Sequence, residues 1–225
     1  VGMSTRMAIE HFYSNRDEAS CGLQDEGSNG NGSLMRILPL VYPLVKDYGY
    51  GLALHDEAMA TIHEFSGLTH GHKRSQMACG IFLAVAGRLL EGSDKEMAVA
   101  KGLKEAKDYY LEHTAFKEDF HCYNRIFEKG FACLPEDAIK SSGYVVHSLE
   151  AALWAFMSTD NYRNAVLKAV NLGHDTETSA AITGGLAGIA YGAATIPDEW
   201  VAAIHRLGYI RELCEALQIH LDKDL

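Results

Sequence analysis

Apolar residues recur every three or four positions along most of this chain, whereas strict alternation of apolar and polar residues is scarce. The first spacing places side chains on one face of a helix, and the second places them on one face of a strand. The pattern predicts helices at about 3–13, 56–68, 74–90 and 145–157. About ten helices along the whole chain, without a recognisable sheet, indicate an all-α fold, in a single compact multi-helical domain.

Three further helices are predicted from signals at their first residues. Ser93-Asp94-Lys95-Glu96 has the form of a capping box, in which Ser93 is the N-cap of a helix that continues to about Tyr110. Asp160 precedes a segment whose apolar residues form one stripe from Ala165 to Leu172. Pro197, followed by two acidic residues, is typical of a first helical turn.

Composition excludes several classes of protein. The 30 acidic residues exceed the 20 basic ones, which gives a formal net charge of −10, and no basic run offers a nucleic acid a binding face. No apolar run reaches the roughly 20 residues that a membrane span needs. The five cysteines are scattered and never spaced as CxxC, which argues against a disulfide framework and a cysteine zinc site. We therefore expect a cytoplasmic protein that binds neither nucleic acid nor membrane.

Three stretches of small or polar residues each precede a predicted helix: 28–33, 141–144 and 171–178. Glycine and asparagine tolerate positive φ, so a loop that is rich in them can turn several backbone N–H groups toward one point. A helix N-terminus adds unpaired N–H groups and a partial positive charge. The first two stretches are therefore candidate anion-binding loops. The alternative is that Asn29-Gly30 and Asn31-Gly32 are ordinary turns.

The third stretch carries Asp175, Glu177 and Thr178, which supply two carboxylates and a hydroxyl within one helical turn. Hard oxygen ligands at this density suit Mg²⁺ or Mn²⁺ better than zinc. The alternative is an ordinary acidic helix start, in which Asp175 caps backbone N–H groups and Glu177 faces the positive end of the helix dipole.

The helix after this stretch carries Gly184, Gly188 and Gly192 at four-residue spacing. Because glycine costs about 1 kcal/mol relative to alanine inside a helix, its repeated use indicates close backbone approach by a neighbouring helix. We therefore predict a central, buried helix with a site at its N-terminal end.

Two histidines and two arginines each allow a ligand-binding and a structural interpretation. His70 and His72 could bind a metal, although a structural role near a helix end is the simpler interpretation. Arg36 and Arg74 could contact a phosphate, with ordinary salt bridges as the alternative.

The order of these motifs resembles the ADP-ribosylglycohydrolase family. The resemblance is carried by 31–36 (Asn-Gly-Ser-Leu-Met-Arg), Thr69-His70, 143–146 (Gly-Tyr-Val-Val) and 171–178 (Asn-Leu-Gly-His-Asp-Thr-Glu-Thr). Residues 141–154 look especially like bacterial members of the dinitrogenase reductase-activating type. The resemblance to the family runs through nearly the whole chain, from Val1 to about Trp200.

The resemblance implies an all-α fold that encloses a two-metal Mg²⁺ or Mn²⁺ site, with ADP-ribose in a cleft over it. Carried over by position, Asp175, Glu177 and Thr178 would be metal ligands, with Asp175 and Glu177 also catalytic. His70 would lie beside the ligand. The diphosphate and ribose would be lined by Asn29, Gly30, Asn31, Ser141, Gly143 and Tyr144. The implied reaction is metal-assisted cleavage between the ribose anomeric carbon and a protein side chain, with an acidic side chain handling protons.

The chain departs from the family pattern in two places. The third motif usually reads Gly-Gly-Asp-Thr-Asp-Thr, whereas His174 and Glu177 stand here for its second Gly and second Asp. The family's N-terminal Thr-Asp-Asp-Thr segment, which supplies the other metal ligands, is absent from the 225 residues. We therefore expect residues 1–225 to be a single ADP-ribosylglycohydrolase-like domain that is N-terminally truncated.

Three functions fit this sequence. The leading hypothesis is a hydrolase that removes ADP-ribose from a modified protein side chain, arginine foremost, or from a related ADP-ribosylated molecule. The alternative is a catalytically silent family member that binds ADP-ribose or is structural. The third is a metal phosphohydrolase of the His-Asp type, because His174-Asp175 is a literal His-Asp pair.

Overall fold

The computed structural model describes residues 2–18 and 21–223, so Val1 and the last residues of the predicted 1–225 domain lie outside the described residues. The described part is all-α, as predicted: β-pairing there is limited to two isolated bridges. The α-helices are α1 (Met3–Asn15), α2 (Val41–Tyr48), α3 (Asp56–Gly67), α4 (Lys73–Leu90), α5 (Lys95–Glu112), α6 (Lys117–Phe120), α7 (Val145–Met157), α8 (Tyr162–Val170), α9 (Thr176–Tyr191), α10 (Asp198–Ala202) and α11 (Leu207–Asp222).

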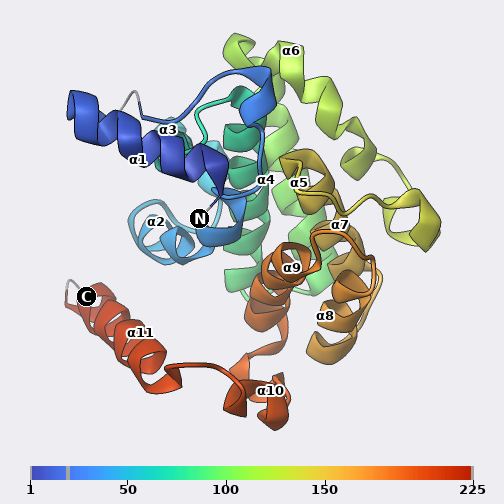
Figure 1. Cartoon of the computed structure of the whole chain (residues 1–225). Helices are drawn as coiled ribbons and strands as arrows, with labels where there is room; N and C mark the ends of the chain where they lie inside the picture. The colour runs from blue at the N-terminus through green and yellow to red at the C-terminus, as the bar shows by residue number, and fades with distance from the viewer. Residues whose placement is uncertain (1, 19–20, 224–225) are drawn as a thin grey trace.

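Helix α4 is the centre of the molecule. Fourteen of its 18 residues are buried, and it packs against α3, α5, α7 and α9 (Figure 1). Its sequence supplies small residues between large ones, so that neighbouring helices approach on every side. At Gly102, α5 approaches the backbone of α4 closely, because a Cβ there would lie 2.7 Å from the Cα of Val85.

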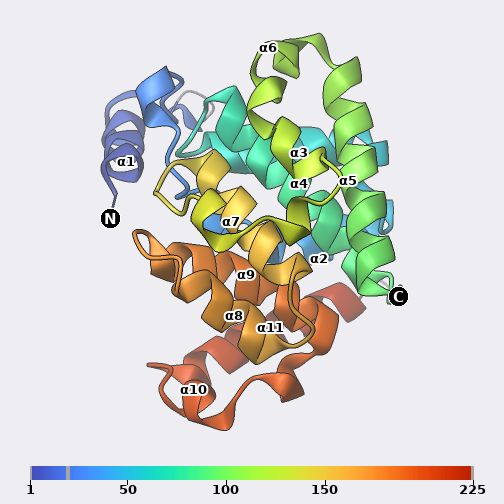
Figure 2. The same ribbon diagram turned by 90° about the vertical axis from the view of Figure 1, so that its right-hand side faces the viewer.

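Helices α7, α8 and α9 form a second group against α4. Helix α7 is buried along nearly its whole length, and α9 packs on both α7 and α8. Helix α10 follows at the far end of this group, and α11 runs from there back toward α2 (Figure 2). No described residue of α11 is buried. Among the described helices, none is long and apolar enough to span a membrane.

The predicted helices are confirmed, with small shifts at their ends. The segment 145–157 begins and ends where the periodicity places it. At α5, however, Asp94 is the N-cap instead of Ser93, because its carboxylate accepts hydrogen bonds from the amides of Glu96 and Met97. Asn161, one residue after Asp160, caps α8 in the same way.

The glycine-based prediction for α9 is wrong in two respects. A Cβ on Gly184 would meet side chains of Tyr162 and Val166, at 3.3 and 3.5 Å, and would not meet the backbone of a neighbouring helix. Gly192 is the C-cap with φ +83°, which is a conformation that glycine adopts without strain. Six of the 16 residues of α9 are buried, so this helix contributes one face to the core, and α4 takes the central position.

Between α5 and α7 the chain runs through 3₁₀ turns at Thr114–Phe116, His121–Phe127, Phe131–Cys133 and Glu136–Ala138, with the four-residue α6 among them. Such short elements leave no repeat in the sequence, and they were not predicted. The last of them leads into the loop that precedes α7.

Candidate functional site

The first two predicted loops lie side by side and pair through their backbones. Gly30 and Tyr144 form an isolated antiparallel bridge. The amide of Asn31 donates to the carbonyl of Gly143 over 3.1 Å, and the amide of Val145 donates to the carbonyl of Asn29 over 3.0 Å. This pairing holds the loop 28–33 against the N-terminal end of α7.

The third predicted stretch joins the same place. The amide of Asp175 donates to the carbonyl of Ser141 over 3.0 Å, and the Ser141 hydroxyl donates to the carbonyl of Gly173 over 2.8 Å. The side-chain amide of Asn31 also donates to Oδ2 of Asp175. Three stretches that are far apart in the chain therefore converge on one site, at the N-terminal ends of α7 and α9.

The alternative interpretation of Asp175 as a helix cap is wrong for its side chain. Asp175 stands at the N-cap position of α9, yet its carboxylate accepts no hydrogen bond from the first turn. Its described partner is instead Nδ2 of Asn31, which also donates to Oγ of Ser148 over 2.7 Å. The carboxylate is therefore held by a side chain from the first loop and not by its own helix.

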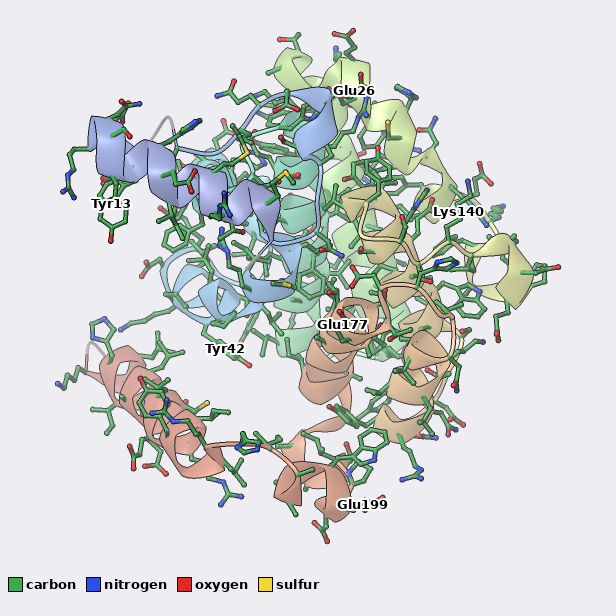
Figure 3. All side chains as sticks on the ribbon, in the orientation of Figure 1. Tyr13, Glu26, Tyr42, Lys140, Glu177 and Glu199 are labelled. Carbon is green, nitrogen blue, oxygen red and sulfur yellow. The ribbon has the colours of Figure 1, made fainter. Side chains whose placement is uncertain are left out.

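The other two candidate metal ligands lie on the first turn of α9. Thr178 is buried, with 7% of its surface exposed, whereas Glu177 is exposed at the N-terminal end of the helix (Figure 3). Within residues 2–18 and 21–223, no group of three or more His, Cys, Asp or Glu side chains is arranged to hold a metal ion. The stretch thus offers hard oxygen donors, in a smaller number than the six or more ligands that Mg²⁺ or Ca²⁺ takes.

His70 lies against the first loop. A Cβ on Gly32 would be 2.8 Å from its Cε1, and one on Gly30 would be 3.4 Å from its Nε2, so glycine at position 32 is what admits the ring. Burial, together with the nearby Arg36 cation, lowers the pKa of His70 to about 4. The imidazole is therefore neutral at pH 7. His72 has a separate structural role, because its Nδ1 accepts the amide of Arg74 at the start of α4.

The two arginines have protein partners of different kinds. Arg74 forms ion pairs with Asp119 at 2.7 Å and Glu26 at 3.2 Å, as the salt-bridge alternative predicts. It also reaches the Tyr144 hydroxyl at 3.5 Å. Arg36 instead donates to the hydroxyl of Thr69 at 2.6 Å and to the backbone carbonyl of Phe65 at 3.3 Å. Among the described contacts it forms no salt bridge, so that expectation is wrong for Arg36.

Two polar side chains at the site were missed by the sequence reasoning. Ser148 accepts from Asn31 and donates to the carbonyl of Ser142. Thr69 bridges Arg36 and the Nδ1 of His70. Ser148 carries a local signal, because it is a polar residue one helical turn after Tyr144 on an otherwise apolar face.

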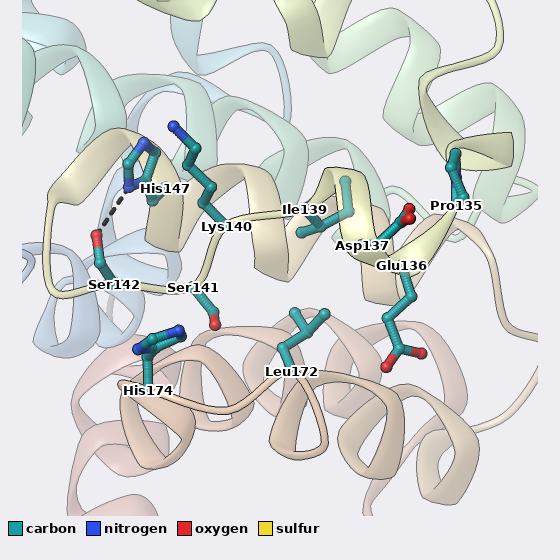
Figure 4. A pocket seen from close by; sticks show the side chains of 10 residues that line it. All are labelled: Pro135, Glu136, Asp137, Ile139, Lys140, Ser141, Ser142, His147, Leu172 and His174. Atoms are coloured by element: carbon teal, nitrogen blue, oxygen red, sulfur yellow. Dashed lines mark hydrogen bonds between the residues drawn. The ribbon is translucent and has the colours of Figure 1, made fainter.

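The literal His174-Asp175 pair does not build a His-Asp metal centre in the part of the chain that the structure describes. His174 is exposed, with φ +58°, and the described residues gather no further metal-binding side chains around it. Its imidazole instead borders a groove beside the site (Figure 4).

Comparison with known proteins gives one family. The model of the ADP-ribosylglycohydrolase family matches residues 1–224. A solved structure described as an ADP-ribosylglycohydrolase-related protein complex superposes with a TM-score of 0.73 and 31% sequence identity, covering 98% of this chain and 68% of that one.

Curated relatives carry related names. The ADP-ribosylarginine hydrolase Tri1 of Serratia proteamaculans is 30% identical over 220 residues, which cover 96% of this chain and 54% of that protein. Tri1 of Pseudomonas putida is 29% identical over 218 residues, with coverages of 96% and 53%. The ADP-ribosyl-[dinitrogen reductase] glycohydrolase of Rhodospirillum rubrum is 27% identical over 206 residues, with coverages of 91% and 60%. The chain thus spans only slightly more than half the length of these relatives.

Proposed function

The chain belongs to the ADP-ribosylglycohydrolase family, and we propose that it forms the ADP-ribose-binding part of a hydrolase that releases ADP-ribose from modified arginine side chains. Relatives named ADP-ribosylarginine hydrolase and ADP-ribosyl-[dinitrogen reductase] glycohydrolase support this substrate class. The observation that carries the proposal is the hydrogen bond from Asn31 to Asp175, because it joins the first loop to the acidic stretch.

In this proposal the diphosphate lies at the N-terminal end of α7, beside the loop 28–33. The first amides of a helix and its dipole attract anions without any lysine or arginine. That matters here because Arg74, the cation beside Tyr144, is already paired with Asp119 and Glu26. Asn29, Gly30, Ser141, Gly143 and Tyr144 would line the diphosphate and the ribose, with the neutral ring of His70 beside them.

The third stretch, 171–178, would hold the metal ion. Asp175, Glu177 and Thr178 fit Mg²⁺ or Mn²⁺ in kind, since all three donate hard oxygen ligands, and they would supply part of its coordination shell. When bound, such an ion would polarise the ribose oxygens and lower the pKa of a water molecule.

The chain's own residues would orient the sugar and move the proton. Asn31 fixes the Asp175 carboxylate through Oδ2, which leaves Oδ1 to face the ligand. In that position Asp175 would serve as the proton acceptor, because a carboxylate can take a proton from an attacking water molecule. Glu177, exposed on the first turn of α9, would be the second acidic group.

All five cysteines are free thiols, and this supports our further proposal that the protein works in the reducing cytoplasm. An ADP-ribosylated protein would be its partner there.

Calorimetry of ADP-ribose binding, with and without Mg²⁺, tests the proposal. We expect binding that Mg²⁺ strengthens, and we expect Asp175→Asn to remove the effect of Mg²⁺. Asp198→Asn, on the first turn of α10, is the matched control and should leave both affinities unchanged. Absence of ADP-ribose binding under both conditions contradicts the proposal, as does hydrolysis by the whole protein that survives Asp175→Ala.

The second candidate function is ADP-ribose binding without catalysis. It is favoured by one observation: the described residues gather no group of three or more His, Cys, Asp or Glu side chains that could hold a metal ion. Binding that is equally strong with and without Mg²⁺ would support this candidate over the hydrolase.

A further inference from the structure

A groove of about 800 Å³ runs beside the candidate site. One wall is the segment 135–142, and the other is the turn from α8 to α9 with Leu172 and His174 (Figure 4). Glu136 and Asp137 lie toward one end of it, whereas Ser142 and His174 lie toward the other. Its volume falls within the range of roughly 300–1,000 Å³ that is usual for ligand-binding clefts.

The groove shares a wall with the site. Ser141 lines the groove, and its carbonyl accepts the amide of Asp175 over 3.0 Å. His174, which also lines the groove, directly precedes Asp175 in the chain. A ligand whose sugar reaches Asp175 therefore has this groove next to its point of attachment.

One wall of the groove includes an extended residue, Ile139, followed by Lys140, whose backbone hydrogen-bonding groups are unused among the described residues. Ile139 has φ −98° and ψ +126°, the extended conformation. Within the described residues, neither the amide nor the carbonyl of the exposed Lys140 takes part in a backbone hydrogen bond. Free groups of this kind pair with another extended chain, which is how many domains bind peptides.

The far end of the groove is negatively charged. Glu136 and Asp137 are both exposed, and neither carboxylate forms an ion pair with another described residue, while acids such as Glu105 and Asp119 are paired with arginines. An unpaired acidic pair at the end of a groove attracts a cationic side chain of the ligand.

We propose that this groove binds the polypeptide segment that carries the ADP-ribosylated side chain, and that Glu136 and Asp137 select segments with a lysine or arginine near the modified residue. The inference rests on the proposed function, and it adds a second determinant of specificity: the sequence around the modified side chain. The segment would lie extended along residues 139–142, with its modified side chain directed at Asp175.

The test uses three ligands and calorimetry on the full chain. The ligands are ADP-ribose, a peptide with one ADP-ribosylated arginine flanked by lysines, and the same peptide flanked by glutamates. We expect the lysine-flanked peptide to bind about fivefold more tightly than the glutamate-flanked one at low salt. High salt should reduce this difference, because exposed charges are screened.

Charge reversal at the groove gives the sharper result. The double variant Glu136→Lys with Asp137→Lys should invert the preference between the two peptides and leave ADP-ribose affinity unchanged. The milder Glu136→Gln with Asp137→Asn should abolish the preference without inverting it. The control Glu112→Lys with Glu118→Lys makes the same change in net charge on α5 and α6, outside the groove, and should keep the original preference.

Failure of the groove proposal and failure of the proposed function give different results. Equal affinity for both peptides, or a preference that follows net charge in the control variant as well, overturns the groove proposal while ADP-ribose still binds. If ADP-ribose itself does not bind, the proposed function falls, and the groove inference falls with it.

Discussion

Asn31 and Asp175 are 144 residues apart in the chain and are joined by a hydrogen bond of 2.5 Å from Nδ2 to Oδ2. The same Nδ2 also donates to Ser148, so one amide connects the first loop to α7 and to the start of α9. Asn31 is nearly buried, at 9% exposure, which strengthens both bonds by excluding water. The assembly of the candidate site therefore depends on this side chain as well as on the backbone hydrogen bonds between its three stretches.

Replacing Asn31 with leucine tests that dependence. Asn31→Leu keeps the approximate size but leaves the Asp175 carboxylate without its donor, so we expect ADP-ribose affinity to fall at least tenfold. The free energy of unfolding should fall by about 1–3 kcal/mol, the usual cost of a buried polar group that loses its partner. Calorimetry and urea unfolding measure the two effects.

The matched variant is Ser148→Ala, which removes the other acceptor and leaves the bond between Asn31 and Asp175 in place. It should reduce affinity less than Asn31→Leu does. Equal losses from both variants would show that the contact with Asp175 is not the one that matters.

The sequence predicts the helices well where an apolar stripe is continuous. The segment 145–157 is the clearest case, because its stripe runs without a break from cap to cap. The stretch between Thr114 and Ala138 was not predicted, since 3₁₀ turns of a few residues leave no repeat to detect. The glycines of α9 were misjudged, because spacing alone does not reveal whether a side chain or a backbone lies opposite them.

The sequence also marks the three stretches of the site, because glycine, asparagine and acidic residues directly before a helix are a local signal. It does not show how those stretches join. The contact between Asn31 and Ser148 spans 117 residues, and nothing in the local sequence of either residue encodes the other. The roles of Asp175, Glu177 and Thr178 in metal binding remain predictions.

Stability should fall as the pH drops from about 6.5 toward 4. Burial and nearby positive charges lower the pKa of His63 to about 3, and burial with the Arg36 cation lowers that of His70 to about 4. Below pH 6.5 the unfolded chain therefore binds protons that the folded chain does not. Each histidine then removes about 1.4 kcal/mol of stability per pH unit until its folded pKa is reached.

Urea unfolding at pH 7, 6 and 5 measures this dependence. His63→Gln should reduce the slope of the unfolding free energy against pH, whatever its effect at pH 7. The exposed His205→Gln is the control and should leave the slope unchanged. Parallel curves for the wild-type chain and His63→Gln would contradict the assignment.

Two glycine-to-alanine changes should have opposite effects. In Gly102→Ala the new Cβ would lie 2.7 Å from the Cα of Val85, so α4 and α5 must separate. We expect a loss of about 1–3 kcal/mol, typical of overpacking. In Gly188→Ala the nearest atom is the Cε2 of Tyr162 at 4.0 Å, and the change should add up to about 1 kcal/mol through helix propensity. Thermal unfolding separates the two, and a stabilising Gly102→Ala would disprove the close contact.

His174 carries backbone strain that a substitution series can measure. It has φ +58° and directly follows Gly173 at φ +83°, so two consecutive residues are in the left-handed region, which costs most L-residues roughly 1–2 kcal/mol. His174→Val should lose about 1–2 kcal/mol, because a β-branched side chain is poorly accommodated there. His174→Asn should be nearly neutral, since asparagine tolerates this conformation. His174→Gly should be neutral or stabilising by up to about 1 kcal/mol, because glycine relieves the strain but has more freedom to lose on folding. A valine variant as stable as the asparagine one in urea unfolding would show that residue 174 is not strained.

If His174 serves only the groove, the glycine variant should bind ADP-ribose as tightly as the wild-type chain does.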